Sequence, residues 1–342
     1  MMGLKNPRVG VVGATGAVGT TMVAILEERD FPVAQLRLMA SSRSAGRTVA
    51  TKWGDIVIED LETADPAGID IALFSAGGAR SRDHAPRFAA AGGTVVDNSS
   101  AFRMDPAVPL VVAEVNDAAI ATNQGIVANP NCTTMVLMMA AGPLHRAATI
   151  DRMSATSYQS VSGSGQTGMD VLAHETDVLG KDRDALVDGE WSDPGSELYA
   201  RPIGFNVLPQ AGSFTDEGYT DEEWKLVHET RKILEAPDIR VEPMCVRVPV
   251  MVGHGIAATM FFERPLSLEE AQQILSAAPG AQLWDDAKVP TPLDSAGIDD
   301  VLIGRVRATV GDTGGISLWT VGDNLRKGAA LNAVQLAELL LD

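Results

Sequence analysis

Apolar residues in the first third of the chain occur in short runs, and each run ends in glycine or in polar residues. Five such runs predict strands, at residues 9–12, 36–40, 69–74, 94–97 and 125–128. A helical pattern follows the first run to about Glu28. Strands that alternate with helices predict an α/β fold with a parallel, doubly wound sheet of the Rossmann type.

The pattern changes after a helical stretch at residues 134–144. Further strands are predicted at residues 153–158, 245–250 and 256–262. Between them, residues 180–214 are irregular and rich in Gly, Pro and Asp, and a loop of that length usually carries function or forms an interface. This half of the chain predicts a second domain of α+β type.

The end of the chain predicts a return to the first sheet. Residues 316–320 have the pattern of a strand, and residues 328–341 form an Ala- and Leu-rich helical stretch that we expect to pack on the first domain. We therefore expect a dinucleotide-binding domain of residues 1–133 with 317–342, and a second domain of residues 134–316.

Composition narrows the classes of function. Of the 342 residues 45% are hydrophobic, which is enough for a buried core. The net charge of −18 argues against nucleic-acid binding, and its ordinary explanation is solubility. The chain has no run of about 18 apolar residues, and residues 1–7 lack the apolar core of a signal peptide. We expect a soluble, cytoplasmic protein with no nucleic-acid or membrane partner.

The two cysteines, Cys132 and Cys245, cannot form a disulfide framework. No Cys/His cluster has the spacing of zinc ligands, so no metal site is predicted. A reducing compartment fits this composition. Cys245 lies in an apolar run and is interpreted as structural.

A glycine-rich turn follows the first predicted strand and opens the first helix. In such a turn the helix N-terminus offers N–H groups to a pyrophosphate. Gly13 permits the sharp turn, Gly16 lets a ligand approach the backbone, and Gly19 lets the helix pack on the strand. The spacing is G-x-x-G-x-x-G and not the commoner G-x-G-x-x-G, so the alternative is a tight turn without a ligand.

The loop after the second predicted strand indicates which dinucleotide is bound. A carboxylate there holds the ribose hydroxyl of NAD, whereas an arginine accepts the 2′-phosphate of NADP. Residues 41–44 contain Arg43 and no acid, which favours NADP. The alternative is that Arg43 is a solvated surface residue.

Cys132 is the candidate nucleophile. It follows the fifth predicted strand and begins a helix, and a helix N-terminus stabilises a thiolate. The alternative is a small buried hydrophobic residue, which is the usual role of a free cysteine. A thiolate that attacks an acyl group also needs a nearby general acid/base, a group that accepts and donates protons.

His254 is the best candidate for that second group, because Gly253 and Gly255 flank it at a strand end. The alternative is a histidine in a surface turn. The other four histidines lie in helical or loop contexts without such flanks; they are His84, His145, His174 and His228.

With these residues the chain resembles bacterial aspartate-semialdehyde dehydrogenases over nearly its whole length. The matching stretches, in chain order, are V-G-A-T-G-A-V-G, D-N-S-S-A-F-R, A-N-P-N-C-T-T, S-Y-Q-S-V-S-G-S-G, E-E-W-K, R-V-P-V-M-V-G-H and G-D-N-L-R-K-G-A-A-L-N. No single stretch is specific, but the ordered set is.

The resemblance implies a reaction. It is the NADPH-dependent reduction of 4-phospho-L-aspartate to L-aspartate 4-semialdehyde, with release of phosphate and through a thioester on Cys132. This step serves the biosynthesis of lysine, diaminopimelate, threonine and methionine. The resemblance also implies a homodimer formed through the second domain.

The resemblance further implies roles for single residues. Cys132 is the nucleophile, His254 the acid/base group, Gln159 a positioning group and Asn131 a neighbour of the thiol. Arg103 and Lys225 bind the substrate phosphate, Arg247 pairs with the α-carboxylate, and Glu222 pairs with the α-ammonium group. The implied cofactor-binding residues are Gly13, Thr15, Gly16, Ala17 and Val18 at the pyrophosphate, Arg43 and Ser44 at the adenosine phosphate, and Ser162, Gly163 and Asn324 at the nicotinamide.

The sequence around Glu222 allows a finer interpretation. Thr220 with Glu223 three residues later is a capping-box pattern, so Glu223 is assigned to the helix start and Glu222 is the freer carboxylate. The alternative for Glu222 and Lys225 is an exposed ion pair at i, i+3. Arg103 and Arg247 have the same alternative, an ordinary surface salt bridge.

Three rival functions remain open at this point. N-acetyl-glutamyl-phosphate reductase performs the same chemistry on an acylated amine, which does not need the carboxylate of Glu222. Glyceraldehyde-phosphate dehydrogenase fits less well, because E-E-W-K and R-V-P-V suit an amino-acid substrate. A non-catalytic NADP sensor would need neither Cys132 nor His254.

Overall fold

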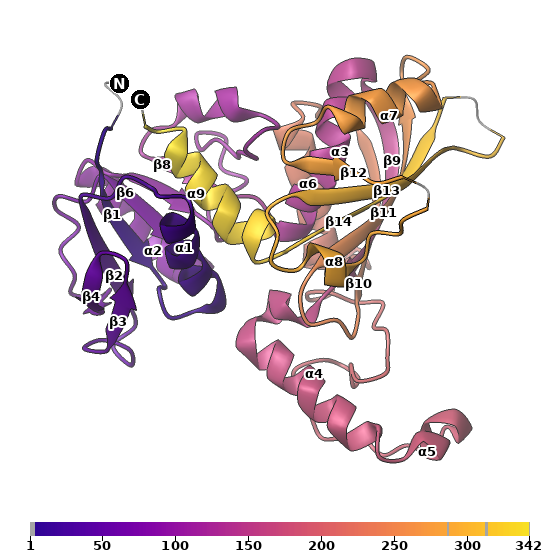
Figure 1. Cartoon of the computed structure of the whole chain (residues 1–342), viewed down its shortest axis with the longest axis horizontal. Helices are drawn as coiled ribbons and strands as arrows, with labels where there is room; N and C mark the ends of the chain where they lie inside the picture. The colour runs from indigo at the N-terminus through magenta and orange to yellow at the C-terminus, as the bar shows by residue number, and fades with distance from the viewer. Residues whose placement is uncertain (1–3, 286, 312–313, 342) are drawn as a thin grey trace. The chain divides into compact units, whose positions relative to one another are not determined.

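The computed structural model describes residues 4–285, 287–311 and 314–341, so the first three residues of the expected N-terminal lead lie outside the described part. The chain forms two compact units (Figure 1). Unit 1 consists of Met1–Gly142, His228–Pro237 and Leu325–Asp342, and unit 2 of Pro143–Val227 and Asp238–Asn324. The chain passes between the units four times: within the helices α3 (Cys132–Ala148) and α6 (Asp221–Ile233), after Pro237, and after Asn324.

Unit 1 is built on a parallel sheet with the strand order β5-β2-β1-β6-β7-β8. This is the order of a dinucleotide-binding fold, with the switch point between β1 and β6. The predicted doubly wound sheet is confirmed. Its strands are β1 (Arg8–Val12), β2 (Gln35–Ala40), β5 (Glu59–Asp60), β6 (Ile71–Phe74), β7 (Thr94–Asp97) and β8 (Ile126–Ala128).

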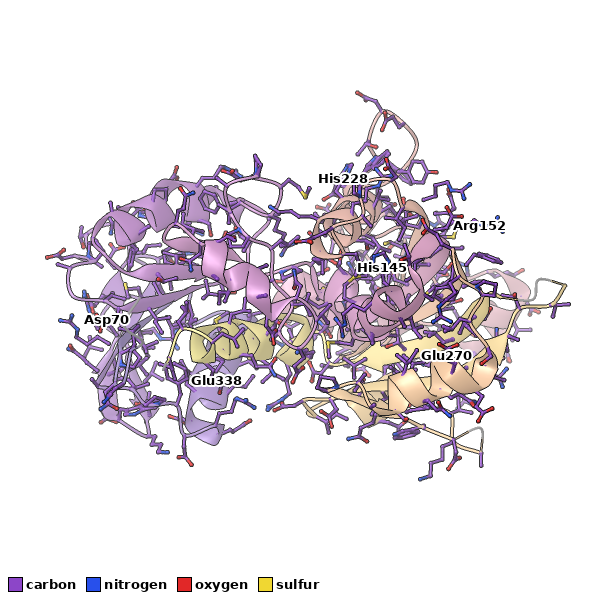
Figure 2. The ribbon with its side chains drawn as sticks, turned by 90° about the horizontal axis from the view of Figure 1, so that it is seen from above. Asp70, His145, Arg152, His228, Glu270 and Glu338 are labelled. Carbon is purple, nitrogen blue, oxygen red and sulfur yellow. The ribbon has the colours of Figure 1, made fainter. Side chains whose placement is uncertain are left out.

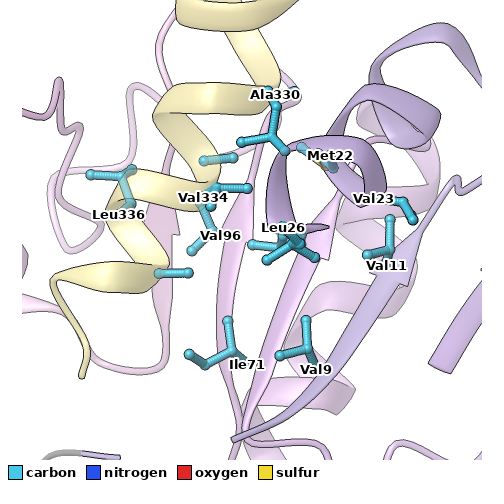
Figure 3. Close-up of a cluster of buried hydrophobic side chains, with 14 of the residues drawn as sticks. Val9, Val11, Met22, Val23, Leu26, Ile71, Val96, Ala330, Val334 and Leu336 are labelled. Atoms are coloured by element: carbon cyan, nitrogen blue, oxygen red, sulfur yellow. The ribbon is translucent and has the colours of Figure 1, made fainter. Parts of the chain in front are cut away.

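The two faces of this sheet are covered by different helices, because successive side chains of a strand point to opposite faces. On one face Val9 and Val11 pack with α1 (Ala17–Glu28) and α9 (Leu331–Glu338), as Figure 3 shows. On the other face Val12 and Phe74 pack with Phe88 of α2 (Gly78–Ala90). The sheet therefore has an apolar core on both sides.

The predicted C-terminal helix does pack in unit 1, but it begins with an irregular turn. Residues Arg326–Ala330 form a π-helical turn, η3, before α9. Two ion pairs, Arg29 with Glu338 and Arg326 with Glu28, join this segment to the end of α1. Unit 1 also contains a two-stranded hairpin, β3 (Thr48–Thr51) and β4 (Gly54–Val57), and a 3-10 turn, η1 (Asp117–Thr122), which the sequence pattern did not predict.

Unit 2 is built on a mixed sheet with the strand order β10-β9-β11-β14-β13-β12. β9 pairs parallel with β10 and antiparallel with β11, and β14 pairs antiparallel with β11 and β13. The predicted α+β character is therefore confirmed. The strands are β9 (Ile150–Gln159), β10 (Arg240–Arg247), β11 (His254–Phe262), β12 (Ala281–Leu283), β13 (Val301–Ala308) and β14 (Ile316–Gly322).

Two expectations about boundaries differ from the structure. The strand at 316–322 belongs to the second sheet, because its backbone pairs with β11 and β13, so the assignment of residues 317–324 to the first domain is wrong. Residues 228–237, expected in the second domain, belong to unit 1. Neither the pairing of this strand nor the assignment of residues 228–237 could be predicted from the local pattern of apolar residues.

Helices flank this second sheet. α7 (Leu268–Ser276) packs on β12 and β13 (Figure 1). α4 (Gly165–Leu179) packs on the short turn η2 (Val161–Ser164). The segment expected to be irregular contains the short helix α5 (Arg183–Asp188), and it is anchored to α4 because Glu175 accepts the backbone N–H of Ile203 and of Gly204. The helical elements are η2 (Val161–Ser164), α4 (Gly165–Leu179), α5 (Arg183–Asp188), α7 (Leu268–Ser276) and α8 (Pro292–Ser295). None of the helices in the described part of the chain is long and apolar enough to span a membrane.

The glycine turn after β1 generates a stability prediction. Gly13 has φ +85°, and a Cβ there would lie 2.2 Å from the carbonyl oxygen of Ser75. We expect Gly13→Ala to lower the free energy of unfolding by about 1–3 kcal/mol, measured by urea denaturation. Gly16→Ala is the matched control, because the nearest atom to its Cβ is 3.5 Å away. Equal losses in the two variants would contradict the prediction.

Candidate functional site

The candidate residues fall into two groups, one in each unit. Unit 1 contains the glycine turn and the thiol together with Arg103, and unit 2 contains the imidazole and the other substrate candidates. Each group is described within its own unit.

The glycine turn of unit 1 has the geometry of a phosphate-binding element. The N–H of Gly13 donates to the carbonyl of Met39 at 2.8 Å, which ties the turn to β2. A Cβ on Gly19 would lie 2.1 Å from the carbonyl oxygen of Gly13, so only glycine lets α1 start this close to the strand. No side chain caps the start of α1 in the described structure. Its first N–H groups are therefore suited to an anion.

The loop after β2 lies next to this turn. The hydroxyl of Thr15 is 3.4 Å from that of Ser44, so the structure brings together two of the predicted cofactor residues. Arg43 is exposed beside them. These positions suit a dinucleotide whose phosphate is recognised by Ser and Arg side chains.

The candidate thiol stands at the first residue of α3. Asn131 caps this helix, because its side-chain oxygen accepts the N–H of Thr133 at 2.9 Å. Cys132 is half-buried, and the 17-residue helix that it begins has its positive end at the thiol. This location stabilises a thiolate.

A buried carboxylate supports the residues around the thiol. Glu229 is 1% exposed; its oxygens accept the N–H of Asn131 at 2.6 Å and an N–H of Arg103 at 3.0 Å. Arg103 also donates to the carbonyls of Asn98 and Asn129. Among the described residues, these contacts use three of its five N–H donors, which leaves two for a ligand. Sequence reasoning missed Glu229, because its partners are far away in the chain.

In unit 2 three candidate side chains are placed by strand register. Gln159 ends β9, and it is paired with Arg247 of β10 on one side and with His254 of β11 on the other. All three are buried. The side-chain amide of Gln159 donates to Glu222 at 3.4 Å, so the structure brings Glu222 to the same end of the sheet.

The helix that carries Glu222 begins as predicted. The hydroxyl of Thr220 accepts the N–H of Glu223, and the carboxylate of Glu223 accepts the N–H of Thr220, which confirms the capping box. Glu222 is left for other contacts and pairs with Lys225 at 3.0 Å. Burial opposes the charge on Lys225, but Glu222 and Asp221 outweigh it and raise the pKa of Lys225.

His254 is a buried, neutral imidazole. Burial and the guanidinium of Arg247 lower the pKa of His254 to about 3. Its Nδ1 accepts the N–H of Ser160, and its Nε2 is buried without a hydrogen-bond partner in the described structure. The Nε of Arg247 is in the same situation. Unpaired buried polar atoms are costly, and a ligand bound here could satisfy both of them.

The remaining cofactor candidates surround this imidazole. The side chain of Asn324 accepts the N–H of Gly253 at 2.9 Å and donates to the hydroxyl of Ser162 at 2.9 Å. A Cβ on Gly163 would lie 3.1 Å from Arg247 and 3.4 Å from Nε2 of His254, so the glycine leaves room at the imidazole. Sequence reasoning missed Ser160, which contacts His254 directly.

Two of the other histidines, His145 and His84, have structural partners. The Nδ1 of His145, on α3, accepts the N–H of Ile150 at 3.0 Å, and the ring of His84 is 3.3 Å from Glu62. His228 lies on α6, and Figure 2 shows both it and His145. The structure thus keeps His254 as the imidazole next to Gln159 and Arg247.

Dehydrogenases that work through a cysteine typically combine a nucleotide-binding sheet with a thiol at a helix start. This chain has both features, and it also buries an imidazole beside a guanidinium. Two family models match the chain: the semialdehyde dehydrogenase NAD-binding domain over residues 8–123 and the semialdehyde dehydrogenase dimerisation domain over residues 142–327. Together they cover most of it.

Curated proteins and solved structures narrow this class. The chain is 51% identical to aspartate-semialdehyde dehydrogenase of Streptomyces akiyoshiensis, over 97% of this chain and 98% of that one. It is 50% identical to the enzyme of Mycolicibacterium smegmatis over 97% and 98% of the two chains. A crystal structure of aspartate semialdehyde dehydrogenase II from Vibrio cholerae, complexed with ASA, has a TM-score of 0.92 at 45% identity and covers 98% of each chain. The chain belongs to the aspartate-semialdehyde dehydrogenase family.

The two thiols generate a prediction. Burial raises the pKa of Cys245 to about 12, so this thiol stays protonated and shielded in the folded protein. We expect iodoacetamide at pH 8 to modify Cys132 and to spare Cys245, as measured by peptide mass spectrometry. Cys245→Ser should leave the labelling intact, and Cys132→Ser should abolish it. Modification of Cys245 before unfolding would contradict the assignment.

Proposed function

We propose that the chain catalyses the NADPH-dependent reductive dephosphorylation of 4-phospho-L-aspartate to L-aspartate 4-semialdehyde. The observation that carries the proposal is the family membership at about 50% identity over nearly the full chain, joined to a thiol at the start of α3. The product serves the biosynthesis of lysine, diaminopimelate, threonine and methionine. We place the reaction in the cytoplasm.

Unit 1 supplies the proposed nucleophile and the side chain that would bind the substrate phosphate. Cys132 as a thiolate attacks the acyl carbon, the bond to phosphate breaks, and a thioester forms on its sulfur. The two donors left on Arg103 suit a phosphate oxygen, and Glu229 holds the guanidinium in place for it. Asn131 keeps the thiol at the helix end by capping α3.

The residues of unit 2 suit the charged groups of an amino acid. The Nε–H of Arg247 has no partner among the described residues and suits the α-carboxylate, and Glu222 supplies a negative charge for the α-ammonium group. We assign Lys225 as a further cation for the substrate phosphate. Gln159 lies between Arg247 and His254 and positions the thioester carbonyl, and His254 serves the oxygen of the same carbonyl.

NADP fits the residues that we assign to it. Gly13 and Gly19 shape the turn that brings the start of α1 to a pyrophosphate, with Thr15, Gly16, Ala17 and Val18 around it. Arg43 and Ser44 suit the 2′-phosphate, and Ser162, Gly163 and Asn324 suit the nicotinamide amide. When bound, NADPH supplies the hydride that reduces the thioester carbon, after which the carbon–sulfur bond breaks and Cys132 returns to thiolate.

We also propose that two copies of the chain form a homodimer through the second domain. The support is the match of residues 142–327 to a dimerisation-domain model. Several large apolar side chains of the segment after α4 are exposed and are available for such an interface; they are Val187, Phe205 and Val207.

An assay of the purified protein tests the reaction. We expect NADP reduction by aspartate semialdehyde to require phosphate, and Cys132→Ala to lower kcat at least 10⁴-fold while NADP still binds, because the thioester cannot form. N-acetyl-glutamate semialdehyde, the rival substrate, should react far more slowly. Normal turnover by Cys132→Ala would overturn the covalent mechanism, and preference for the acetylated substrate would overturn the substrate.

The role of Glu222 is tested separately. We expect Glu222→Gln to raise KM for aspartate semialdehyde roughly 10- to 100-fold with little change in KM for NADP, because a charge-assisted contact to an ammonium group is lost. Asp221→Asn is the matched control, because Asp221 pairs with the same Lys225 but is half-exposed. An unchanged KM in Glu222→Gln would withdraw the ammonium assignment.

A further inference from the structure

Two asparagines lie side by side at the carboxyl edge of the sheet of unit 1. Asp97, the last residue of β7, pairs in register with Ala128, the last residue of β8, so Asn98 and Asn129 follow the two strands at the same level. Arg103 donates from Nη2 to the carbonyl of Asn98 and from Nε to the carbonyl of Asn129, both at 2.9 Å. The backbone of these two asparagines therefore sets the plane of the guanidinium.

A third asparagine, Asn332 of α9, holds Asn129 through its side chain. The N–H of Ala113 donates to Oδ1 of Asn332 at 2.9 Å, which fixes the orientation of that amide. Its Nδ2 then donates to the carbonyl of Val111 at 3.0 Å and to Oδ1 of Asn129 at 2.6 Å. Both hydrogens on Nδ2 of Asn332 are thus used, and Oδ1 of Asn129 accepts one of them.

The amide of Asn129 is oriented by the same reasoning. Since its Oδ1 accepts, its Nδ2 carries both hydrogens, and it donates to Oδ1 of Asn98 at 2.6 Å and to the carbonyl of Ala329 at 3.0 Å. Asn129 and Asn332 are both 0% exposed, and every amide hydrogen of the two side chains has an acceptor. A buried network with all its donors satisfied is rigid and specifies one arrangement.

The π-helical turn η3 determines the side from which α9 meets this network. The N–H of Ala330 donates to the carbonyl of Leu325, five residues earlier, at 2.9 Å. One extra residue in a turn rotates the helix that follows by about 100°, and such turns are frequent at functional sites. Asn332 lies two residues after this turn, so η3 sets the direction in which its side chain reaches Asn129.

The loop that carries Asn98 is held from the other side. The carboxylate of Asp97 is buried, and its two oxygens accept the hydroxyls of Ser81 and Ser99, each at 2.7 Å. The N–H of Asn98 itself donates to the carbonyl of Phe74 at 2.9 Å. The carbonyl that Asn98 offers to the guanidinium therefore has a fixed position.

We propose that Asn129 and Asn332 are positioning residues that orient Arg103 for the substrate phosphate. The inference rests on the phosphate-binding role proposed for Arg103, and it extends the site to the C-terminal helix α9. Two of the three contacts of Arg103 described above depend on the asparagines, and the third is made by Glu229. Replacing both partners of a buried hydrogen bond by apolar groups costs little stability, so stability alone does not require asparagine at two fully buried positions.

Oxidation of aspartate semialdehyde with NADP and inorganic phosphate tests the proposal. Asn332→Ala leaves Oδ1 of Asn129 without its donor, so we expect KM for phosphate to rise about tenfold, with kcat and KM for NADP changed less than about threefold. Asn116→Ala is the matched control, because this asparagine of unit 1 also accepts a backbone N–H, from Val112, and donates to a carbonyl, that of Leu110. Equal KM values for phosphate in the two variants would overturn the proposal.

A second background separates the orientation of Arg103 from a general loss of structure. Arg103→Lys keeps the charge but lacks the Nε–H that the carbonyl of Asn129 accepts. Asn332→Ala added to it should raise KM for phosphate less than about twofold further, and the full tenfold rise there would overturn the proposal. If Asn332→Ala does not fold, Asn332→Asp replaces it, because the carboxylate keeps the volume and accepts the N–H of Ala113 but cannot donate to Asn129.

Protection of Cys132 measures phosphate binding without turnover. We expect inorganic phosphate to slow the modification of Cys132 by iodoacetamide, and Asn332→Ala to raise the half-protecting concentration about tenfold. If phosphate protects the unchanged chain but that chain does not oxidise aspartate semialdehyde, the proposed function fails, and the inference is decided by the variant. Normal turnover with the same half-protecting concentration in Asn332→Ala overturns the inference alone. No protection of the unchanged chain overturns the phosphate role of Arg103, and the inference with it.

Discussion

The register of three strands in unit 2 is the constraint on which the candidate site depends. Gln159, Arg247 and His254 are neighbours only because β9 pairs with β10 and β11 in one register. A slip by one residue would turn every side chain of a strand to the opposite face. The same pairing buries the imidazole, and burial is the largest cause of its lowered pKa. Backbone hydrogen bonds thus set both the location and the protonation state of a side chain.

In unit 1 a buried ion pair, and not strand register, orients the candidate residues. Arg103 and Glu229 are both nearly inaccessible, and removing either would leave a charge unpaired at a cost of about 3–5 kcal/mol. Such a pair contributes little net stability, so its value lies in orientation. One carboxylate fixes the guanidinium and the backbone that precedes the thiol. Lys232 supports the same region, because it donates to the carbonyls of Arg103, Asp105 and Val108.

The sequence pattern predicted five of the six parallel strands of unit 1 to within two residues at each end, because buried strands are short apolar runs with clear breaks. It missed β5, which has two residues. It was less successful in unit 2. The strand at 240–247 was predicted at 245–250, because its first half alternates with polar residues and contains Pro243. The strand at 301–308 was not predicted, and β14 was assigned to the wrong sheet.

The sequence alone determined the features that depend on near neighbours. The glycine turn, the capping box at Thr220 and Glu223, and the thiol at the start of α3 are all decided within a few residues, where sterics and local hydrogen bonds act. Only the tertiary structure decided that Glu229 meets Arg103, 126 residues away, and that Ser160 meets His254, 94 residues away. These contacts arise from strand pairing and helix packing, and no local pattern encodes which distant partner a buried charge or ring nitrogen finds.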